Sequence, residues 1–275
     1  MGQRSRRRQR RRGGIGGKLA LVGGGLFVAV GLAAIAVTSW VLDVAAEAPS
    51  LAACKKVDRG GNTAIYAGDG SRLGLVDSDE ARAPVSIERV PKRLQLATVA
   101  IEDQRFYEHG GIDLEGIARA ALKNLEAGRT VEGGSTITQQ LVRNLCLRNP
   151  KRDLERKIIE AQLAVEYAER HSRQEILGQY LNIASYGTVE GATAIGVGAA
   201  AKIYFSKPVW KLDVAQVALL AGLPQAPSEY NPLLHPHEAL RRRNAVLSTL
   251  LSQRCTWSGA RPKTCHPLPS PLALE

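Results

Sequence analysis

The chain has 275 residues, of which 44% are hydrophobic, and a formal net charge of +11. This is enough apolar material for one large domain or two small ones with appendages. Seven arginines and Lys18 place eight positive charges before residue 19 and leave +3 for the rest, so the composition does not indicate a domain that binds nucleic acid.

An uncharged segment follows the basic tail. Residues 19–42 carry no charged side chain, and a helix of that length reaches about 36 Å, enough to cross a hydrocarbon core of about 30 Å. The basic residues 1–18 predict a cytoplasmic tail against anionic lipid, with the chain after Asp43 outside the membrane. A cleaved signal peptide is the alternative, because residues 45–48 resemble a cleavage site. The apolar run exceeds an ordinary signal sequence, so we expect a retained single-pass anchor.

The remaining chain divides into a linker, one domain and a tail, at residues 43–61, 62–254 and 255–275. Near the start of the domain, β-prone runs on either side of a Gly-Asp-Gly turn at residues 68–70 predict a β-hairpin. Apolar periodicity, capping residues and prolines predict helices over 92–102, 114–127, 135–149, 153–168, 173–183, 199–205, 212–223 and 238–253. Ser172 with Glu175 forms a capping box at the start of the helix 173–183.

Two stretches lack a helical pattern. The glycine-rich residues 187–198 are expected to form a loop, and residues 255–275, with four prolines, a loose tail. The fold class is therefore mainly α with a small hairpin near its start. In the long helix 153–168 the side chains expected to face the interior are Leu154, Ile158, Ala161 and Val165.

The four cysteines match no metal-binding spacing. They allow three disulfide pairings, and the sequence does not decide among them. Outside the membrane, Cys255 and Cys265 could close a short loop near the end of the chain.

Polar side chains gather at two places about thirty residues apart. The end of the helix 92–102 and the residues after it contribute the polar residues Glu102, Asp103 and His109, together with the aromatic Phe106. A Gly-Gly turn and the helix that it opens contribute Gly134, Ser135, Thr136, Thr138, Gln139 and Gln140. We interpret them as two walls of one polar cleft, in which a helix N-terminus suits sugar hydroxyls and an anionic phosphate. The alternative is structural, because Thr136 with Gln139 satisfies a capping box and paired carboxylates at a helix end are often solvated.

A basic segment with a second glutamate follows. Its members are Arg143, Arg152, Arg156, Lys157 and Glu160. Two separated carboxylates suit an inverting glycosyl transfer, and basic side chains can neutralise a leaving diphosphate. The plainer alternative is a solvated helix face with an Arg156–Glu160 pair worth about 0.3–0.5 kcal/mol. No Asp/Glu cluster indicates a dedicated magnesium site, so no cofactor is expected, although a divalent cation could assist the diphosphate.

These motifs, in this order with residues 175–182 and 218–227, resemble the peptidoglycan glycosyltransferases of family 51. That family includes the N-terminal half of class A penicillin-binding proteins and the monofunctional transglycosylases. The resemblance covers roughly residues 62–251 and implies a lysozyme-like, two-lobed domain. The last two motifs are expected to be scaffolding and core.

The resemblance also implies roles. Glu102 matches the general base that deprotonates the acceptor's sugar 4-hydroxyl, and Glu160 matches the acidic position that assists the leaving diphosphate. The basic positions around the diphosphate are matched by Arg143, Arg152, Arg156 and Lys157. His109 is expected to be a fixed hydrogen-bonding group and Phe106 a buried anchor. The implied reaction polymerises lipid II into β-1,4 glycan strands and releases undecaprenyl diphosphate.

Three departures from the family pattern concern details. Arg143 stands where lysine is more frequent, Ser206 replaces a glycine, and residues 187–198 are longer than usual. No Ser-x-x-Lys, Ser-x-Asn and Lys-Thr-Gly set occurs, so no transpeptidase is expected, and whether the natural chain is monofunctional or bifunctional stays open.

Two other functions remain as alternatives: a lysozyme-like enzyme that cleaves glycan, and a non-catalytic membrane scaffold. The retention of both Glu102 and Glu160 argues against the scaffold. The expected partners are lipid II, the membrane and, as further possibilities, transpeptidases and proteins of the divisome or elongation machinery.

Overall fold

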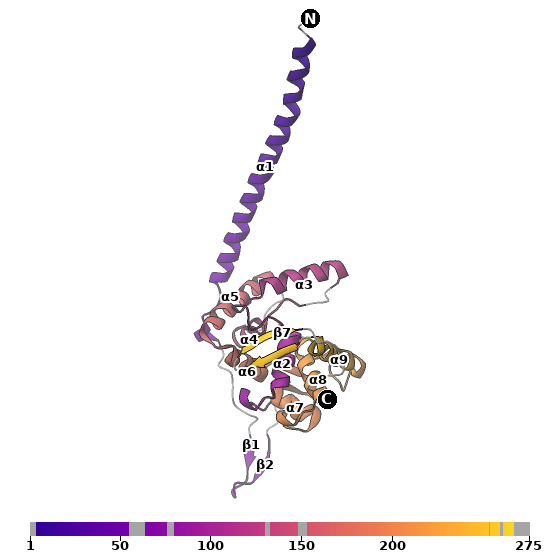
Figure 1. The fold of residues 1–275 in the computed structure, drawn as a ribbon. Helices are drawn as coiled ribbons and strands as arrows, with labels where there is room; N and C mark the ends of the chain where they lie inside the picture. Colours follow the sequence, from indigo (N-terminus) through magenta and orange to yellow (C-terminus); the bar gives the residue numbers. More distant parts are fainter. Residues whose placement is uncertain are drawn as a thin grey trace. The chain divides into compact units, whose positions relative to one another are not determined.

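The computed structural model describes residues 4–54, 64–75, 80–129, 133–147, 153–252, 254–258 and 261–266. The chain divides into two compact units, one made of residues 1–48 with 153–159 and the other of residues 49–152 with 160–275 (Figure 1). Each unit is described by itself.

The first unit is dominated by one long helix, α1 (Arg4–Ala46). Its part from Val22 to Ala46 has a mean hydropathy of 2.2, and within the described residues it is the one helix long and apolar enough to cross a membrane. The predicted span, 19–42, overlaps this segment.

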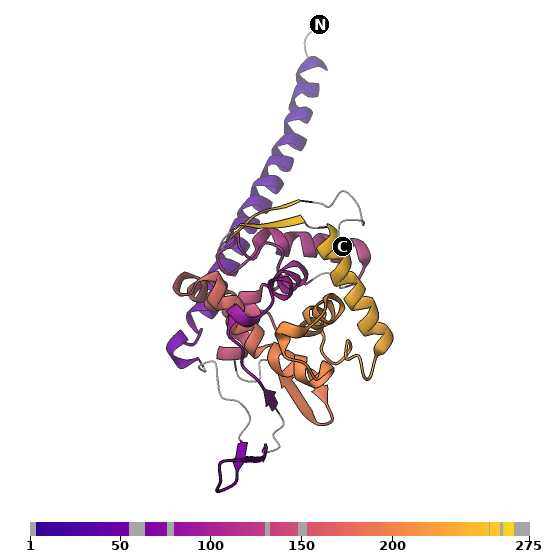
Figure 2. The ribbon, with the colours of Figure 1, turned by 60° about the horizontal axis from the view of Figure 1, so that its bottom comes forward.

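The second unit is mainly helical, as the sequence predicted. Its α-helices are α2 (Lys92–Glu102), α3 (Leu114–Ala127), α4 (Ile137–Cys146), α6 (Arg173–Ile183), α7 (Val197–Phe205), α8 (Val214–Gly222) and α9 (Pro236–Ser252), and the part of α5 (Leu154–Arg170) from residue 160 on also belongs to it. Short 3-10 turns are η1 (Leu51–Ala53), η2 (Ile87–Arg89), η3 (Val209–Lys211) and η4 (Leu223–Gln225). The apolar helix α8 packs beside α2 and α9 (Figures 1 and 2), and α4 packs against α6.

Local signals account for several helix ends. Thr136 and Ser172 each accept the backbone N–H three residues on, and Gln139 and Glu175 return a side-chain bond to the cap, so both predicted capping boxes are confirmed. Gly128 ends α3 with a left-handed φ of 61°, as expected of a glycine after a helix. These three helix ends are therefore encoded by residues close to them in the sequence.

The predicted hairpin is present as strands β1 (Ala64–Tyr66) and β2 (Arg72–Leu75). The loop prediction for residues 187–198 is wrong. There, β4 (Ser185–Val189) and β5 (Ala192–Ile195) pair antiparallel, and β3 (Glu80–Arg82) adds to β5 in parallel. Positive φ at Glu190 and Gly191 makes the turn between them. The sequence does not reveal this sheet because its third strand lies more than a hundred residues away along the chain.

The buried face of α5 also differs from the prediction. Leu154 is exposed, whereas Glu160, Leu163, Ala164 and Tyr167 are buried. The interior face is therefore offset from the apolar stripe and includes a glutamate, which periodicity of apolar residues alone cannot identify.

The apolar stripe of α3 faces solvent rather than the core. Leu114, Leu122 and Leu125 are 76%, 62% and 80% exposed, and the buried positions of this helix are Gly116 and Ala120. An exposed apolar face of this kind indicates an interaction surface.

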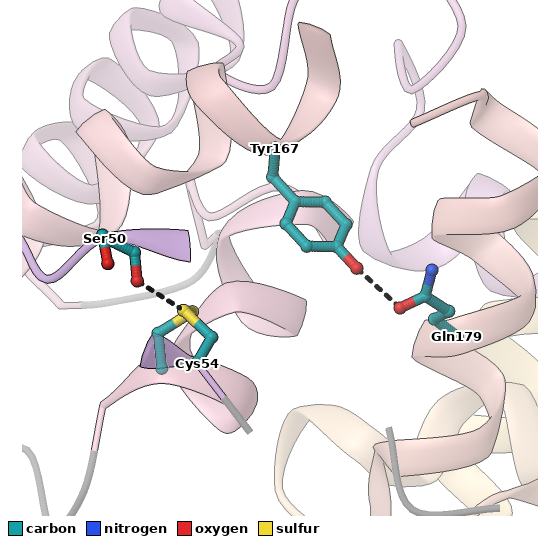
Figure 3. The surroundings of a disulfide bond; sticks show 5 residues. Ser50, Cys54, Tyr167 and Gln179 are labelled. Atoms are coloured by element: carbon teal, nitrogen blue, oxygen red, sulfur yellow. Dashed lines mark hydrogen bonds between the residues drawn. A yellow bond between two sulfur atoms is a disulfide. The ribbon is translucent and has the colours of Figure 1, made fainter. Parts of the chain in front are cut away.

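One disulfide settles part of the cysteine question. Cys54, just after η1, pairs with Cys146 at the end of α4, across 92 residues of sequence, and Figure 3 shows Cys54 beside Ser50. In the C-terminal segment, β6 (Arg254–Ser258) and β7 (Arg261–His266) form an antiparallel hairpin, so the loose-tail prediction is wrong for these residues. The register places Cys255 opposite Cys265, but their side chains lie outside the described part of the structure, and their pairing stays a prediction.

Candidate active site

Glu102 is the last residue of α2, and its side chain is 5% exposed. Its Oε2 accepts a hydrogen bond from Nε2 of Gln140, the fourth residue of α4 in the second wall, at 2.9 Å. Its Oε1 lies 3.5 Å from a terminal guanidinium nitrogen of Arg242 and accepts no hydrogen bond from the described residues. The structure therefore joins the first wall to the second at this carboxyl.

The surroundings of Glu102 shift the pKa of its carboxyl in both directions. Burial raises the pKa of its carboxyl above the usual value, because the charged form loses water. The N–H of Gln140 and the positive charges of Arg242 and Arg143 act to lower this pKa, while the neighbouring charge of Asp103 acts to raise it. The net shift is upward, so the carboxyl takes up protons more readily than an exposed glutamate.

The adjacent carboxyl, on Asp103, is fixed by the fold. Its Oδ2 accepts the N–H of Ile137, the first residue of α4, at 3.0 Å, and its Oδ1 lies 2.8 Å from Nε2 of His109. The other ring nitrogen of His109 accepts the N–H of Gly111, so the proton of the neutral ring resides on Nε2 and is donated to Asp103. The geometry agrees with the interpretation of His109 as a fixed hydrogen-bonding group.

The part of the first wall that follows Asp103 is held by close packing. Phe106 is fully buried, with Arg173 above its ring and the same guanidinium donating to the carbonyl of His109. Gly111 has a φ of 102°, and a Cβ there would come within 2.3 Å of the carbonyl oxygen of Ala164. Only glycine fits this position, which makes the turn a rigid part of the wall.

The hydroxyls and amides of the second wall differ in accessibility. Thr136 and Gln139 are buried in the capping box, with the Thr136 hydroxyl also donating to the carbonyl of Gly111, and Thr138 is fully buried. Gly134 packs tightly, since a Cβ there would lie 3.2 Å from Cα of Ile117. Gln140, Ser135 and Arg143 keep partial exposure. Substrate contact from this wall is therefore expected first from the partly exposed residues.

An open surface hollow elsewhere is not part of this site. It is lined by Glu88, Arg89, Val90, Pro91, Lys92 and Trp210. Its lining lies at the N-terminal end of α2, about 15 Å along the helix from Glu102 at the other end. In the described residues no group of three His, Cys, Asp or Glu side chains could hold a metal ion.

Comparison with known proteins assigns the chain to a family. The family model described as transglycosylase matches residues 69–251, well over half of the chain. The chain belongs to the transglycosylase family. Among relatives, penicillin-binding protein 1A of Aquifex aeolicus is 46% identical over 189 residues, covering 69% of this chain and 25% of that protein. Penicillin-binding protein 1A of Escherichia coli is 44% identical over 189 residues, covering 69% and 22%.

This transglycosylase domain spans about a quarter of the length of those curated relatives. A crystal structure of penicillin-binding protein 1A from Haemophilus influenzae also matches, with 28% identity, a TM-score of 0.37, and coverage of 69% of this chain and 18% of that one. At that score the structural likeness adds nothing to the argument. The mainly α fold is observed directly, and the two-lobed, lysozyme-like arrangement stays a prediction.

The other predicted site residues of the transglycosylase domain are placed less fully. Glu160 is fully buried on α5. Arg156 and Lys157 are half-buried residues of the first unit, where the N–H of Arg156 bonds to the helix cap Asp153 at 2.8 Å. Arg152 lies outside the described residues. The basic clamp therefore remains a prediction.

Arg242 on α9 was not predicted. It reaches Glu102 from 140 positions further along the chain, and its Nε donates to the carbonyl of Gly222 at 3.1 Å. Gly222 admits it closely, since a Cβ there would lie 2.8 Å from Cγ of Arg242. The sequence signal was the run of three arginines at 241–243 in the last helix of the domain, which amphipathic periodicity alone did not distinguish.

Proposed function

We propose that this chain is a membrane-anchored peptidoglycan glycosyltransferase that polymerises lipid II by inverting transfer. The observation that carries the proposal is the carboxyl of Glu102, buried between the amide of Gln140 and the guanidinium of Arg242. One of its oxygens accepts no hydrogen bond from the described residues, so it retains a lone pair for a substrate proton.

In the proposed step, Glu102 takes the proton of the acceptor's GlcNAc 4-hydroxyl. The oxygen of that 4-hydroxyl forms a bond to the anomeric carbon of the growing chain's MurNAc as the bond from that carbon to the diphosphate breaks. The product is a β-1,4 linkage, and undecaprenyl diphosphate leaves. Because Oε1 of Glu102 is inaccessible to solvent, acceptor binding must displace the side chains that cover it.

Charge near the carboxyl has two roles in this mechanism. Arg242 and Arg143 favour the ionised, base-competent form of Glu102 against the cost of burial. The predicted clamp residues Arg143, Arg152, Arg156 and Lys157, with Glu160, are proposed to hold and release the diphosphate.

Two further features support the cellular setting. A disulfide within the segment after the apolar helix, Cys54–Cys146, is typical of an oxidising compartment and supports an extracytoplasmic domain with a cytoplasmic N-terminus. The exposed leucines of α3 suit contact with a bilayer, which a domain acting on lipid-linked substrates would require.

The test is polymerisation of lipid II by the detergent-solubilised chain, wild type beside Glu102→Gln. Polymer and released undecaprenyl diphosphate from the wild type, with a loss of about a thousandfold in the folded variant, are expected of a general base. Release of muropeptides from sacculi would instead indicate the glycan-cleaving alternative. Lipid II binding without any product from the wild type would favour the scaffold.

A further inference from the structure

The amide of Gln140 lies between two buried groups from different helices. On one side its Nε2 donates to Oε2 of Glu102 at 2.9 Å. On the other its Oε1 accepts the hydroxyl proton of Tyr180, on α6, at 3.2 Å. Tyr180 is 1% exposed, so water does not compete for this hydroxyl.

The donors and acceptors of Glu102, Gln140 and Tyr180 can be matched in only one arrangement. An ionised carboxylate only accepts hydrogen bonds, so the amide of Gln140 must turn its nitrogen toward Glu102. Its oxygen then faces Tyr180, whose hydroxyl has a single proton to donate. Burial raises the pKa of the Tyr180 hydroxyl well above its usual value, and the charge of Glu102 raises it further, so this proton stays in place. Each bond polarises the next in the same direction.

We propose that Tyr180 is a positioning residue for the glycosyl transfer, which holds the Gln140 amide with its N–H toward Glu102 and thereby keeps that carboxyl ionised. The inference rests on the proposed function, in which Glu102 is the base. Without the tyrosine hydroxyl, the amide can turn its oxygen toward a protonated Glu102 and accept the carboxyl O–H, which stabilises the neutral form of the carboxyl.

Other charged and titratable groups also face Glu102, and they set the background for this effect. They are Arg242 from α9, Arg143 from α4, Asp103 from its own helix end and Tyr186 from β4. None of them is changed when only the Tyr180 hydroxyl is removed, so the substitution isolates the contribution of the amide orientation.

The chain supplies a matched control. Tyr167 on α5 is also buried and donates its hydroxyl proton to the amide oxygen of Gln179 on α6 at 2.6 Å (Figure 3). The chemistry of this pair is the same, but Gln179 is not the glutamine that donates to Glu102. Tyr167→Phe therefore measures the general cost of removing a tyrosine–glutamine hydrogen bond.

The experiment compares the pH dependence of lipid II polymerisation for wild type, Tyr180→Phe and Tyr167→Phe. For Tyr180→Phe we expect the acidic limb of kcat/KM to move to higher pH, with a roughly fivefold to tenfold loss at pH 7 that shrinks as the pH rises. KM should stay within about twofold, because the hydroxyl is too buried to touch substrate. Tyr167→Phe should leave the limb where it is. An unmoved limb in Tyr180→Phe, or an equal movement in both variants, overturns the proposal.

A second measurement does not depend on activity. In protein labelled with ¹³C at glutamate carboxyls, the signal lost in Glu102→Gln identifies Glu102, and Tyr180→Phe should raise its titration midpoint. Adding Tyr180→Phe to Gln140→Leu should produce no further movement, because the tyrosine acts through the amide. An inactive wild type would sink the proposed function, while the titration would still decide the role of Tyr180. An unchanged midpoint would sink the positioning role even if the enzyme is active.

Discussion

Glu102 and Asp103 are consecutive carboxylates at one helix end, yet the fold treats them in opposite ways. Asp103, with a side chain 2% exposed, has both oxygens engaged, one by the N–H of Ile137 and the other by His109. Glu102 has one oxygen engaged by Gln140, and the other faces the guanidinium of Arg242 at 3.5 Å.

The difference follows from which helix end each carboxylate meets. Asp103 reaches the N-terminus of α4, where free N–H groups and the helix dipole favour a negative charge. Glu102 sits at the C-terminal end of α2, where the dipole disfavours it, and burial raises the pKa of its carboxyl. The fold therefore uses one carboxylate to build the wall and keeps the other available for chemistry.

The largest expected effect is that of replacing Glu102, which should change both turnover and stability. Glu102→Gln should lose about a thousandfold in turnover. Its free energy of unfolding at neutral pH should nevertheless be higher than that of the wild type, by on the order of 1 kcal/mol. A carboxyl whose folded pKa is raised binds more protons when folded, so stability falls as pH rises from the unfolded toward the folded pKa. The gain in the variant should therefore vanish at a pH below the ordinary glutamate pKa.

Thermal melts of both proteins between acidic and neutral pH measure this gain. A variant that is less stable than wild type at neutral pH would mean that the Glu102 charge is well compensated by Arg242 and Gln140, and the contrast with Asp103 would disappear.

The next effect concerns the charge that favours the ionised form of Glu102. Arg242→Met should move the acidic limb of kcat/KM to higher pH and reduce kcat/KM at pH 7 by about tenfold to a hundredfold, since an opposite charge close to a buried carboxylate is lost. Arg242→Lys should recover part of the loss.

Arg241→Met is the matched control for Arg242→Met. Arg241 is the preceding residue of α9, where it is exposed and pairs with Glu238. Arg241→Met should leave the acidic limb of kcat/KM unchanged. A uniform loss at every pH in Arg242→Met would show that the arginine acts on substrate or on folding rather than on the base.

The different roles of Glu102 and Asp103 could be predicted only in part from the sequence. The helices and the capping boxes at Thr136 and Ser172 depend on residues within a few positions, so pattern and propensity identified them. The two walls were also expected, because each is a local motif. The sequence did not tell which of Glu102 and Asp103 would be locked, since the N–H of Ile137 lies 34 positions away.

Tertiary contacts explain what the sequence missed. The β3–β5–β4 sheet depends on pairing across more than a hundred residues, and the buried face of α5 is set by its neighbours rather than by its own apolar stripe. Arg242 reaches the site only because α9 packs on α2 and α8. The partner of Cys54 was one of three possibilities until the fold brought Cys146 to it.

A smaller effect on turnover is expected at Asp103, the carboxylate with both oxygens hydrogen-bonded. Asp103→Asn keeps an acceptor for the N–H of Ile137 but turns an amide N–H₂ toward the N–H of His109, which leaves buried donors without acceptors. We expect a loss of about 2–3 kcal/mol in unfolding free energy and a drop of roughly 5–10 °C in Tm. Turnover per folded molecule should fall less than tenfold. A deep loss of turnover at unchanged Tm would place Asp103 in the chemistry and erase the distinction from Glu102.

The smallest effect is expected at His109, the partner that completes the lock on Asp103. His109→Gln retains an N–H that can reach the carboxylate, so we expect turnover within about fivefold of wild type and a stability loss of about 1 kcal/mol.

The shape of the pH profile of His109→Gln decides its role. A histidine that carries a proton in the reaction would remove a limb of the profile when replaced, whereas a fixed hydrogen-bonding group leaves both limbs in place. His171→Gln, at a partly exposed histidine stacked on Tyr167, measures the cost of losing an imidazole away from Asp103. If His109→Gln keeps both limbs and loses more stability than His171→Gln, the ring belongs with Asp103 to the wall, and Glu102 alone at this helix end performs proton transfer.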